Sequence, residues 1–372
     1  MFAQVSNSNL EIDNLLGVDN TQKKGWASKQ RLIKMCQDEV GTLCHGKRPL
    51  NIAIIGLSGC GKSSFLNTIF ASFSDKNWKQ IALHGNFGQT GNQVTQSLIS
   101  YKKEQYYTRK GRYGKDDGIL MPTFIDMCGF EDNNNELNRQ LLNCVLYGKM
   151  NEYEKFKVVY DCFDKAGKDG VKRTYGERNE YLVVDRIIFV CSADPESHLP
   201  TNLMECVRQV SNAVRVIPVF GVMTKADKFG GRLNAIVQER ERKFRAHLGL
   251  PAERFRRIKN YCEDIDANTS YRYSLIPEID TNVLELMNQV FSNSLRVANS
   301  EGRLDYSVQT NRFVHESQDV ANQVPGRNGL PKSSSGPVDG YDFTKRNQAN
   351  IGDGVCYNCN SNCVLLYFLL NL

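Results

Sequence analysis

The sequence has no run of about 18 apolar residues, the length that a membrane-spanning helix needs, so we expect no such helix. Residues 1–30 also lack the apolar centre of a secretory signal and carry Glu11, Asp13 and Asp19, which indicates a cytoplasmic protein. In that reducing compartment the twelve cysteines are expected to be thiols rather than a disulfide framework. Histidine is scarce, and the five histidines are scattered without metal-ligand spacing.

The composition that remains is ordinary for a globular protein. The 372 residues are 41% hydrophobic and 24% charged, which excludes collagen-like, mucin-like and wholly disordered chains. At about 150 residues per domain, this length suggests two or three domains. The 47 basic and 41 acidic residues leave a formal net charge of +6, a small excess for a protein that binds nucleic acid. We therefore predict no specific nucleic-acid partner.

The apolar pattern divides the chain into three parts. Residues 1–47 are polar and predict an N-terminal extension with one short helix. Residues 48–297 carry the strand and helix patterns of one domain, with a charged insertion at about 131–182. In residues 298–372 the periodicity stops, and glycine, proline and serine predict a disordered tail with a cysteine-rich apolar end.

Short apolar runs rich in β-branched residues predict buried strands. They lie at Asn51–Gly56, Leu120–Ile125, Asp185–Cys191, Val216–Met223 and Arg257–Cys262. Helical patterns alternate with these runs, and the last helix is expected to start at a cap on Thr281 or Asn282. The basic, aromatic segment 101–117 is expected to continue an edge strand into a hairpin. The alternation predicts an α/β fold with a mostly parallel sheet and helices on both faces.

One segment fits the phosphate-binding pattern G-x-x-x-x-G-K-[ST], after a predicted strand and before a predicted helix. It runs Gly56, Leu57, Ser58, Gly59, Cys60, Gly61, Lys62 and Ser63, and Ser64 follows. Glycines let backbone N–H groups turn toward phosphate oxygens, and the helix directs its positive end at them. Lys62 is expected to reach the β and γ phosphates in a catalytic role, and the Ser63 hydroxyl to ligate Mg²⁺. The segment predicts the P-loop of an NTPase.

A D-x-x-G segment, Asp126 to Gly129, ends another predicted strand. In P-loop enzymes an aspartate at this place holds Mg²⁺ through water, and the glycine N–H meets the γ-phosphate. A threonine that senses the metal must lie before Asp126. We assign that catalytic and metal-binding role to Thr95, with Thr90 as the rival. The predicted metal ligands are therefore Ser63, Thr95 and Asp126.

A T-K-x-D segment at a later strand end is expected to distinguish guanine from adenine. It consists of Thr224, Lys225, Ala226 and Asp227. A carboxylate can accept from both N1–H and the exocyclic amine of guanine, whereas adenine lacks that donor pair. The stem of Lys225 is expected to lie along the base. Asn260, after the last predicted strand, is expected on the base side of the site.

These stretches resemble the interferon-induced protein 44 and 44-like GTPase family. The likeness covers about residues 48–297 and is carried by Gly61–Asn67, Gly118–Gly129, Leu146–Lys149, Val184–Val190 and Lys259–Tyr261. It implies a cytoplasmic P-loop G domain, often linked to immune defence or growth restraint. By the motif match it assigns nucleotide roles to Gly56, Gly61, Lys62, Ser63, Thr95, Asp126, Gly129, Lys225 and Asp227. Vertebrate members of the family carry a further N-terminal domain, which residues 1–47 are expected to be too few to form. Several members degrade the guanine motif, whereas this chain keeps both Lys225 and Asp227.

The expected function is GTP binding with Mg²⁺ and slow hydrolysis to GDP in a switch protein. Phe130 stands where many small GTPases have the glutamine that orients the attacking water. One alternative is a nucleotide-gated scaffold with negligible turnover, and another is a self-assembling GTPase on membranes. The aspartate of T-K-x-D disfavours an ATP-using enzyme. A second copy of the chain or an unknown protein is the expected partner.

Two further features have simpler explanations than a binding site. The basic segment 101–117 could contact nucleic acid or anionic lipid, but charge that guards an exposed edge strand explains the same residues and is the explanation we favour. Cys356, Cys359 and Cys363 have zinc-like spacing without a fourth ligand nearby. Membrane contact is expected only if these cysteines are lipidated.

Overall fold

The computed structural model describes most of residues 20–292. The described ranges are 20–43, 48–75, 77–82, 96–107, 109, 117–229, 235–261 and 274–292. All of them belong to one compact unit, Met1–His315. In these ranges no helix is both long and apolar enough to cross a membrane. The predicted tail, with Cys356, Cys359 and Cys363, lies outside the described residues, and so do Thr90 and Thr95.

A six-stranded sheet forms the centre of this unit, in the order β2-β3-β1-β4-β5-β6. Its strands are β1 (Asn51–Ile55), β2 (Ile99–Tyr101), β3 (Thr123–Asp126), β4 (Arg186–Ser192), β5 (Val219–Thr224) and β6 (Phe255–Ile258). Every neighbouring pair is parallel except β2 and β3, which are antiparallel. The predicted α/β fold with a mostly parallel sheet is confirmed.

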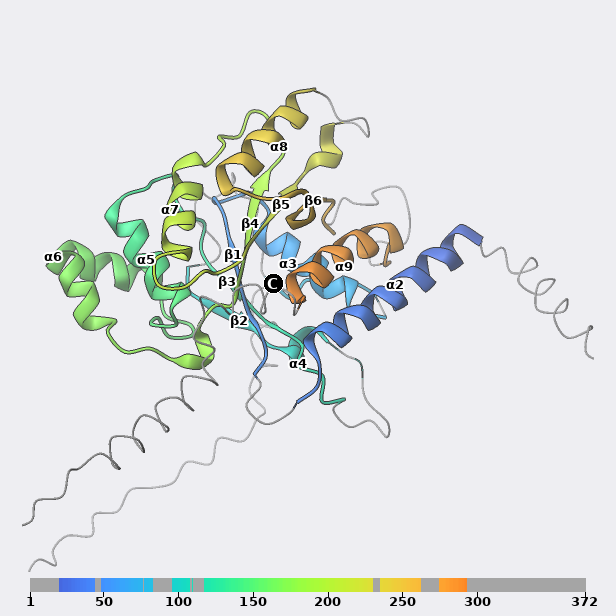
Figure 1. Ribbon diagram of the computed structural model, residues 1–372, viewed down its shortest axis with the longest axis horizontal. Coiled ribbons are helices and arrows are strands. Elements are labelled where there is room, and N and C mark those ends of the chain that lie inside the picture. The colour runs from blue at the N-terminus through green and yellow to red at the C-terminus, as the bar shows by residue number, and fades with distance from the viewer. Residues whose placement is uncertain are drawn as a thin grey trace, which may run out of the picture. The chain divides into compact units, whose positions relative to one another are not determined.

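Helices cover both faces of the sheet (Figure 1). They are α2 (Asn20–Val40), α3 (Lys62–Ser72), α4 (Lys103–Tyr106), α5 (Glu136–Leu146), α6 (Phe156–Thr174), α7 (Thr201–Ser211), α8 (Ala235–Leu248) and α9 (Pro277–Phe291). Alternate residues of β1 separate the two layers: Ile52 and Ile54 pack with α2, α3 and α9, while Ala53 and Ile55 pack with α5 to α8. This alternation follows from the period of two in a strand.

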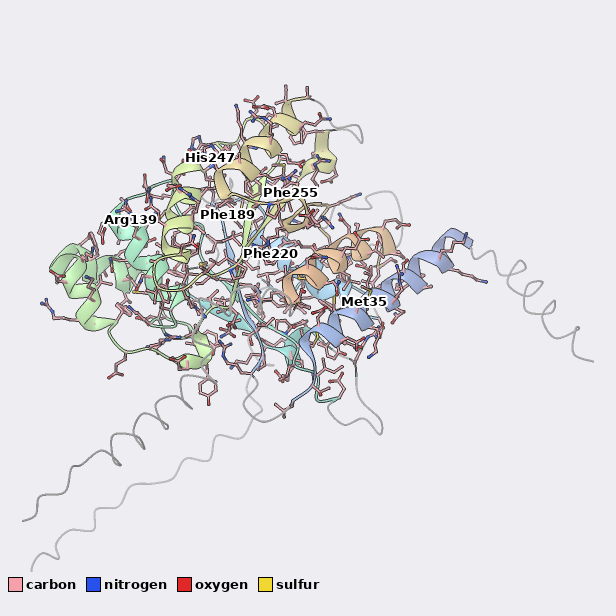
Figure 2. All side chains as sticks on the ribbon, viewed as in Figure 1. Met35, Arg139, Phe189, Phe220, His247 and Phe255 are labelled. Atoms are coloured by element: carbon pink, nitrogen blue, oxygen red, sulfur yellow. The ribbon has the colours of Figure 1, made fainter. Side chains whose placement is uncertain are left out.

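The inner strands are buried on both faces, which is why their sequences read as continuous apolar runs. Phe189 of β4 and Phe220 of β5 lie in the centre of the unit (Figure 2), and neither is exposed. Phe189 belongs to the α5–α8 side and Phe220 to the α2–α3–α9 side. These neighbouring strands therefore contribute large apolar side chains to the cores on both faces of the sheet.

Several predicted boundaries are wrong by a few residues, for reasons visible in the sequence. Strand β5 begins only at Val219, directly after Pro218, which has no N–H for a ladder. Helix α9 begins at Pro277 rather than after a Thr281 or Asn282 cap, since proline suits the first helical position. The predicted edge strand and its antiparallel pairing with the next strand are confirmed by β2 and β3, but the strand ends at Tyr101 and the chain then forms the short helix α4.

The insertion contains two helices, α5 and α6, where one was predicted. Its segment before α6 pairs through the backbone with residues that precede β2: Ser97 and Lys155 form an antiparallel bridge. The Leu98 N–H donates to the Glu154 carbonyl at 3.1 Å, and the Tyr153 N–H donates to Leu98 at 2.8 Å. The insertion is thus joined to the edge of the sheet.

The N-terminal segment differs most from its prediction. It forms a 21-residue helix, α2, rather than one short helix in an extension. Leu32, Ile33 and Cys36 are buried with α9 in one core. The residues of α2 after Gln22, whose side chains the structure describes, are therefore part of the domain.

A fully buried ion pair joins α2 to α9. Lys29 Nζ lies 2.8 Å from Asp280 Oδ2, and neither side chain is exposed. The ammonium also donates to the Ser74 carbonyl at 2.7 Å. Burial raises the pKa of Asp280 and lowers that of Lys29, while their mutual attraction opposes both shifts. Each charge depends on the other, because neither can reach water.

Lys29→Met should lower the free energy of unfolding by about 3–5 kcal/mol, since it leaves the Asp280 carboxylate buried without its cation. Burial raises the pKa of Asp280, and the variant has no Lys29 to oppose that shift. Protonation of Asp280 at low pH then removes the uncompensated charge, so the loss of unfolding free energy should shrink as the pH falls. Lys34→Met is the matched control, because Lys34 on the same helix is exposed and its pair with Asp38 contributes little. Urea unfolding measures both variants. Equal losses in the two would contradict a stabilising role for the buried pair.

Candidate functional site

The predicted site residues that the structure describes lie in loops and strand ends at one edge of the sheet. Strands β1, β3, β4, β5 and β6 are parallel, so their carboxyl ends share this edge. The loop Gly56–Gly61 leaves β1 there, and α3 begins at Lys62. Asp126 is the last residue of β3, and Thr224 is the last residue of β5.

Gly61 turns the loop into α3. Its φ of 95° lies in a region that residues with a side chain rarely adopt. A Cβ atom at this position would lie 3.3 Å from Thr224 Oγ1 and 3.4 Å from Asn260 Nδ2. Glycine therefore allows three segments to meet: the loop, the end of β5 and the residues after β6. The first amides of α3 follow directly and have no partner within the helix.

Lys62 spans the loop. Its Nζ donates to the Leu57 carbonyl at 2.9 Å and lies 3.4 Å from the Gly56 carbonyl. The side chain is 8% exposed. The loop thus holds a nearly buried ammonium group by its own carbonyls, at the start of a helix whose amides favour an anion.

Ser63 and Asp126 face each other beside this lysine. Ser63 Oγ donates to Asp126 Oδ2 at 3.0 Å, and the Met127 N–H donates to Asp126 Oδ1 at 3.0 Å. Burial raises the pKa of Asp126 to about 6, although Lys62 and the Ser63 hydrogen bond favour its charged form. Two oxygen ligands of the kind that Mg²⁺ prefers therefore lie within one hydrogen bond of each other.

The D-x-x-G segment packs against the loop Gly56–Gly61. A Cβ atom at Gly129 would lie 2.3 Å from the backbone N and Cα of Ser58, so only glycine fits. The Phe130 N–H donates to the Gly56 carbonyl at 3.2 Å. The backbone contact fixes the two predicted motifs relative to each other.

The T-K-x-D segment contacts the same loop from β5. Thr224 is fully buried, and its Oγ1 donates to the Cys60 carbonyl at 2.6 Å. Lys225 Nζ donates to the Gly59 carbonyl at 2.9 Å, so its stem crosses the loop. Lys225 has a φ of 61°, an uncommon backbone state for a side-chain residue that packed surroundings must maintain.

Asp227 and Asn260 lie at the outer end of this arrangement. Asp227 is exposed in the turn Ala226–Phe229, directly after Lys225. Asn260 Nδ2 donates to the Gly61 carbonyl at 3.5 Å, which places the loop after β6 beside the loop Gly56–Gly61. Thr95 and Thr90, our two threonine candidates, lie outside the described residues.

Ser64 and Cys60 have backbone roles in the described site. Burial raises the pKa of the Cys60 thiol, and the Cys60 carbonyl accepts from Thr224. The Ser64 carbonyl accepts from Thr68 Oγ1 at 2.8 Å. Thr68 and Tyr261 were missed by sequence reasoning, yet both hold the loop after β6. The spacing of four residues between Ser64 and Thr68, which share a helix face, is the signal that could have revealed Thr68.

Metal ligation by this site depends on few protein groups. In the described ranges, no three His, Cys, Asp or Glu side chains are grouped so that they could hold a metal ion. Mg²⁺ in phosphate-transfer sites commonly takes one or two protein oxygens and completes its shell with phosphates and water. Ser63 and Asp126 suit that kind of site.

The basic segment is largely paired where the structure describes it. Lys103 Nζ lies 2.6 Å from Asp117, Arg109 lies 2.6 Å from Asp75, and Lys102 lies 3.6 Å from Glu152. These partners favour the explanation in which charge guards the sheet edge. Residues 110–116 lie outside the described part.

Comparison with protein-family models and with curated protein sequences finds no match to this chain. The resemblance to the interferon-induced protein 44 family therefore stays a prediction. Function is inferred from the fold and from the geometry of the site.

Lys62→Ala should weaken binding of nucleoside triphosphates by at least about tenfold, because it removes a charge-assisted contact to the phosphates. Lys79→Ala is the control, because Lys79 is exposed and lies outside the three motifs. Fluorescence titration with labelled GTP measures both, and circular dichroism checks that each variant is folded. Wild-type affinity in a folded Lys62→Ala protein would show that this loop does not bind phosphate.

Proposed function

We propose that this chain is a P-loop G-domain protein that binds GTP with Mg²⁺ and hydrolyses it slowly. The observation that carries the proposal is the hydrogen bonding of one loop to two other motifs. Thr224 and Lys225 donate to carbonyls of the loop, and Ser63 at its end donates to Asp126. The parallel sheet brings these segments to one edge, and their hydrogen bonds to the loop support a common nucleotide site.

Phosphate binding would use the loop amides and Lys62. The start of α3 offers N–H groups to an anion, and the glycines leave room for close approach of the phosphates. Lys62 now donates to Leu57 and Gly56, and in the complex it would exchange those carbonyls for β and γ phosphate oxygens. Buried Asp126 and Ser63 would hold Mg²⁺, which when bound offsets charge on the phosphates.

Base recognition would use Lys225 and Asp227. The Lys225 side chain is fixed across the loop, and its apolar stem offers a surface for a flat base. Asp227 follows two residues later and is open to solvent, so its carboxylate can meet the N1–H and amine of guanine. Adenine would leave that carboxylate without a donor, which favours GTP over ATP.

Slow hydrolysis follows from the residue after Gly129. Phe130 is 3% exposed and has no group that orients water. Glu131 carries a negative charge that would approach the γ-phosphate unfavourably. We therefore propose intrinsic turnover on the order of 10⁻² s⁻¹ or below, as for switch GTPases without an added arginine. A second copy or a protein partner would accelerate it.

The family resemblance suggests a switch role in innate defence within the cytoplasm. Two other functions use the same site. A nucleotide-gated scaffold would bind GTP with negligible turnover, and a self-assembling membrane-associated GTPase would show turnover that rises with protein concentration. Phosphate release measured over a wide concentration range separates the three.

Asp227→Asn should shift nucleotide preference from GTP toward XTP. The new amide donor would oppose the guanine donors but would complement the acceptor that xanthine carries at the same place. Asp38→Asn on α2 is the control, because Asp38 is exposed and pairs with Lys34 on the same helix. Competition of GTP and XTP for each protein measures the ratio of affinities. Retention of the wild-type ratio in Asp227→Asn would mean that this carboxylate does not read the base.

A further inference from the structure

The loop after β6 is held by one buried tyrosine. Tyr261 follows Asn260 and is fully buried. Its ring stacks on Trp78, with ring centroids 5.8 Å apart. Both polar ends of the residue, the backbone N–H and the phenol hydroxyl, make hydrogen bonds to other elements. The tyrosine therefore fixes the position of the loop more tightly than apolar packing alone would.

The backbone N–H of Tyr261 connects the loop to α3. It donates to Thr68 Oγ1 at 3.0 Å, and that hydroxyl donates to the Ser64 carbonyl at 2.8 Å. Ser64 lies in the first turn of α3, directly after the P-loop motif. The same Thr68 Oγ1 lies 3.4 Å from Asn260 Oδ1. One threonine thus links the loop after β6 to the beginning of the phosphate-binding helix.

The hydroxyl of Tyr261 connects the loop to α9. It accepts from the Ile276 N–H at 2.5 Å and donates to Asp280 Oδ1 at 3.0 Å. Burial raises the pKa of Tyr261, which keeps this hydroxyl protonated and able to donate. The other oxygen of Asp280 accepts from Lys29 of α2 at 2.8 Å. The chain of contacts runs from α2 through α9 and the loop to the P-loop.

Asn260 lies between two fixed points of this chain. Ile258 is paired with Thr224 in the sheet, and Tyr261 is held by Thr68 and Asp280. Only two residues separate these points, so Asn260 cannot move far without breaking one of them. Its amide accordingly stays beside the Gly61 carbonyl.

We propose that Tyr261 is a positioning residue, which holds the Asn260 loop at the base side of the site with support from the Lys29–Asp280 pair. This proposal rests on the proposed function, because it assigns the loop to recognition of guanine. Tyr261 does not touch nucleotide. It acts through the loop, and α2 acts through Asp280.

A loosened loop would weaken contacts to the base and leave contacts to the phosphates unchanged. Tyr261→Phe keeps the ring on Trp78 and removes only the hydroxyl. We expect GTP affinity to fall about fivefold to tenfold, because the loop loses its tie to α9, while ATP affinity stays within about twofold. Thr68→Val, which removes the hydroxyl at the other end with little change in volume, should lower the same ratio.

Tyr147→Phe is the matched control. Tyr147 is buried, and its hydroxyl likewise accepts from a backbone N–H, that of Val214 at 3.3 Å, and donates to a carbonyl, that of Val210 at 2.9 Å. Val210 lies in the last turn of α7 and Val214 follows that helix, at the sheet edge opposite the P-loop. This variant should lose stability in a similar way while it keeps the wild-type ratio of GTP to ATP affinity.

The experiment titrates each protein with labelled GTP and labelled ATP in Mg²⁺ buffer and records its melting temperature. A fall in the ratio for Tyr261→Phe and Thr68→Val, but not for Tyr147→Phe, supports the proposal. A wild-type ratio in both site variants, or an equal fall in the control, overturns it while GTP binding stands. A wild-type protein that does not prefer GTP overturns the proposed function and this proposal with it.

Discussion

The hydrogen bond from Thr224 to the Cys60 carbonyl is the contact on which the site depends. It ties the end of β5 to the loop after β1, across the end of β4 that lies between them. The bond is possible because these strands are parallel, so their carboxyl ends meet at one edge. The bond also fixes the position of Lys225, the next residue, and of Asp227 beyond it. The Lys225 ammonium group donates to the Gly59 carbonyl, which directly precedes Cys60 in the loop. With the Lys225 contact, the Thr224 bond joins the loop Gly56–Gly61 to the T-K-x-D segment.

Support for this edge extends far from the loop itself. Asp280 accepts hydrogen bonds from Tyr261 and Lys29, so one buried carboxylate joins three segments that are distant in the sequence. Such a group is costly to bury, and a well-packed apolar set of residues would often be as stable. The advantage of Asp280 over apolar residues would be precise positioning. Its directional hydrogen bonds determine the position of the loop after β6, whereas apolar packing tolerates small shifts.

Short sequence patterns predicted the strands and the positions of the motifs at their ends, because both depend on neighbouring residues. The β-branched runs identified the strands, and the two motifs, taken at consecutive strand ends, placed Ser63 and Asp126 where the structure finds them as neighbours; their role in nucleotide binding stays a prediction. Strand edges such as Val219 were missed because apolar residues before Pro218 continue the pattern outside the sheet. Helix α2 was taken for part of an extension because its partner, α9, is far away in the sequence: Lys29 and Asp280 are 251 residues apart. No local pattern reveals a pair of that kind, and the roles of Thr68 and Tyr261 depend on the same long-range packing.

The most direct test of the account is a titration of the wild-type protein with labelled GTP and ATP, each with and without Mg²⁺. A site that reads the guanine donors through a carboxylate should bind GTP at least about a hundredfold more tightly than ATP. Mg²⁺ should strengthen binding of the triphosphate, because the proposed site would hold it with Ser63 and Asp126, whose oxygens are 3.0 Å apart. Equal affinities for GTP and ATP, or no binding of either by the folded protein, would contradict the claim that these three motifs form a guanine-nucleotide site.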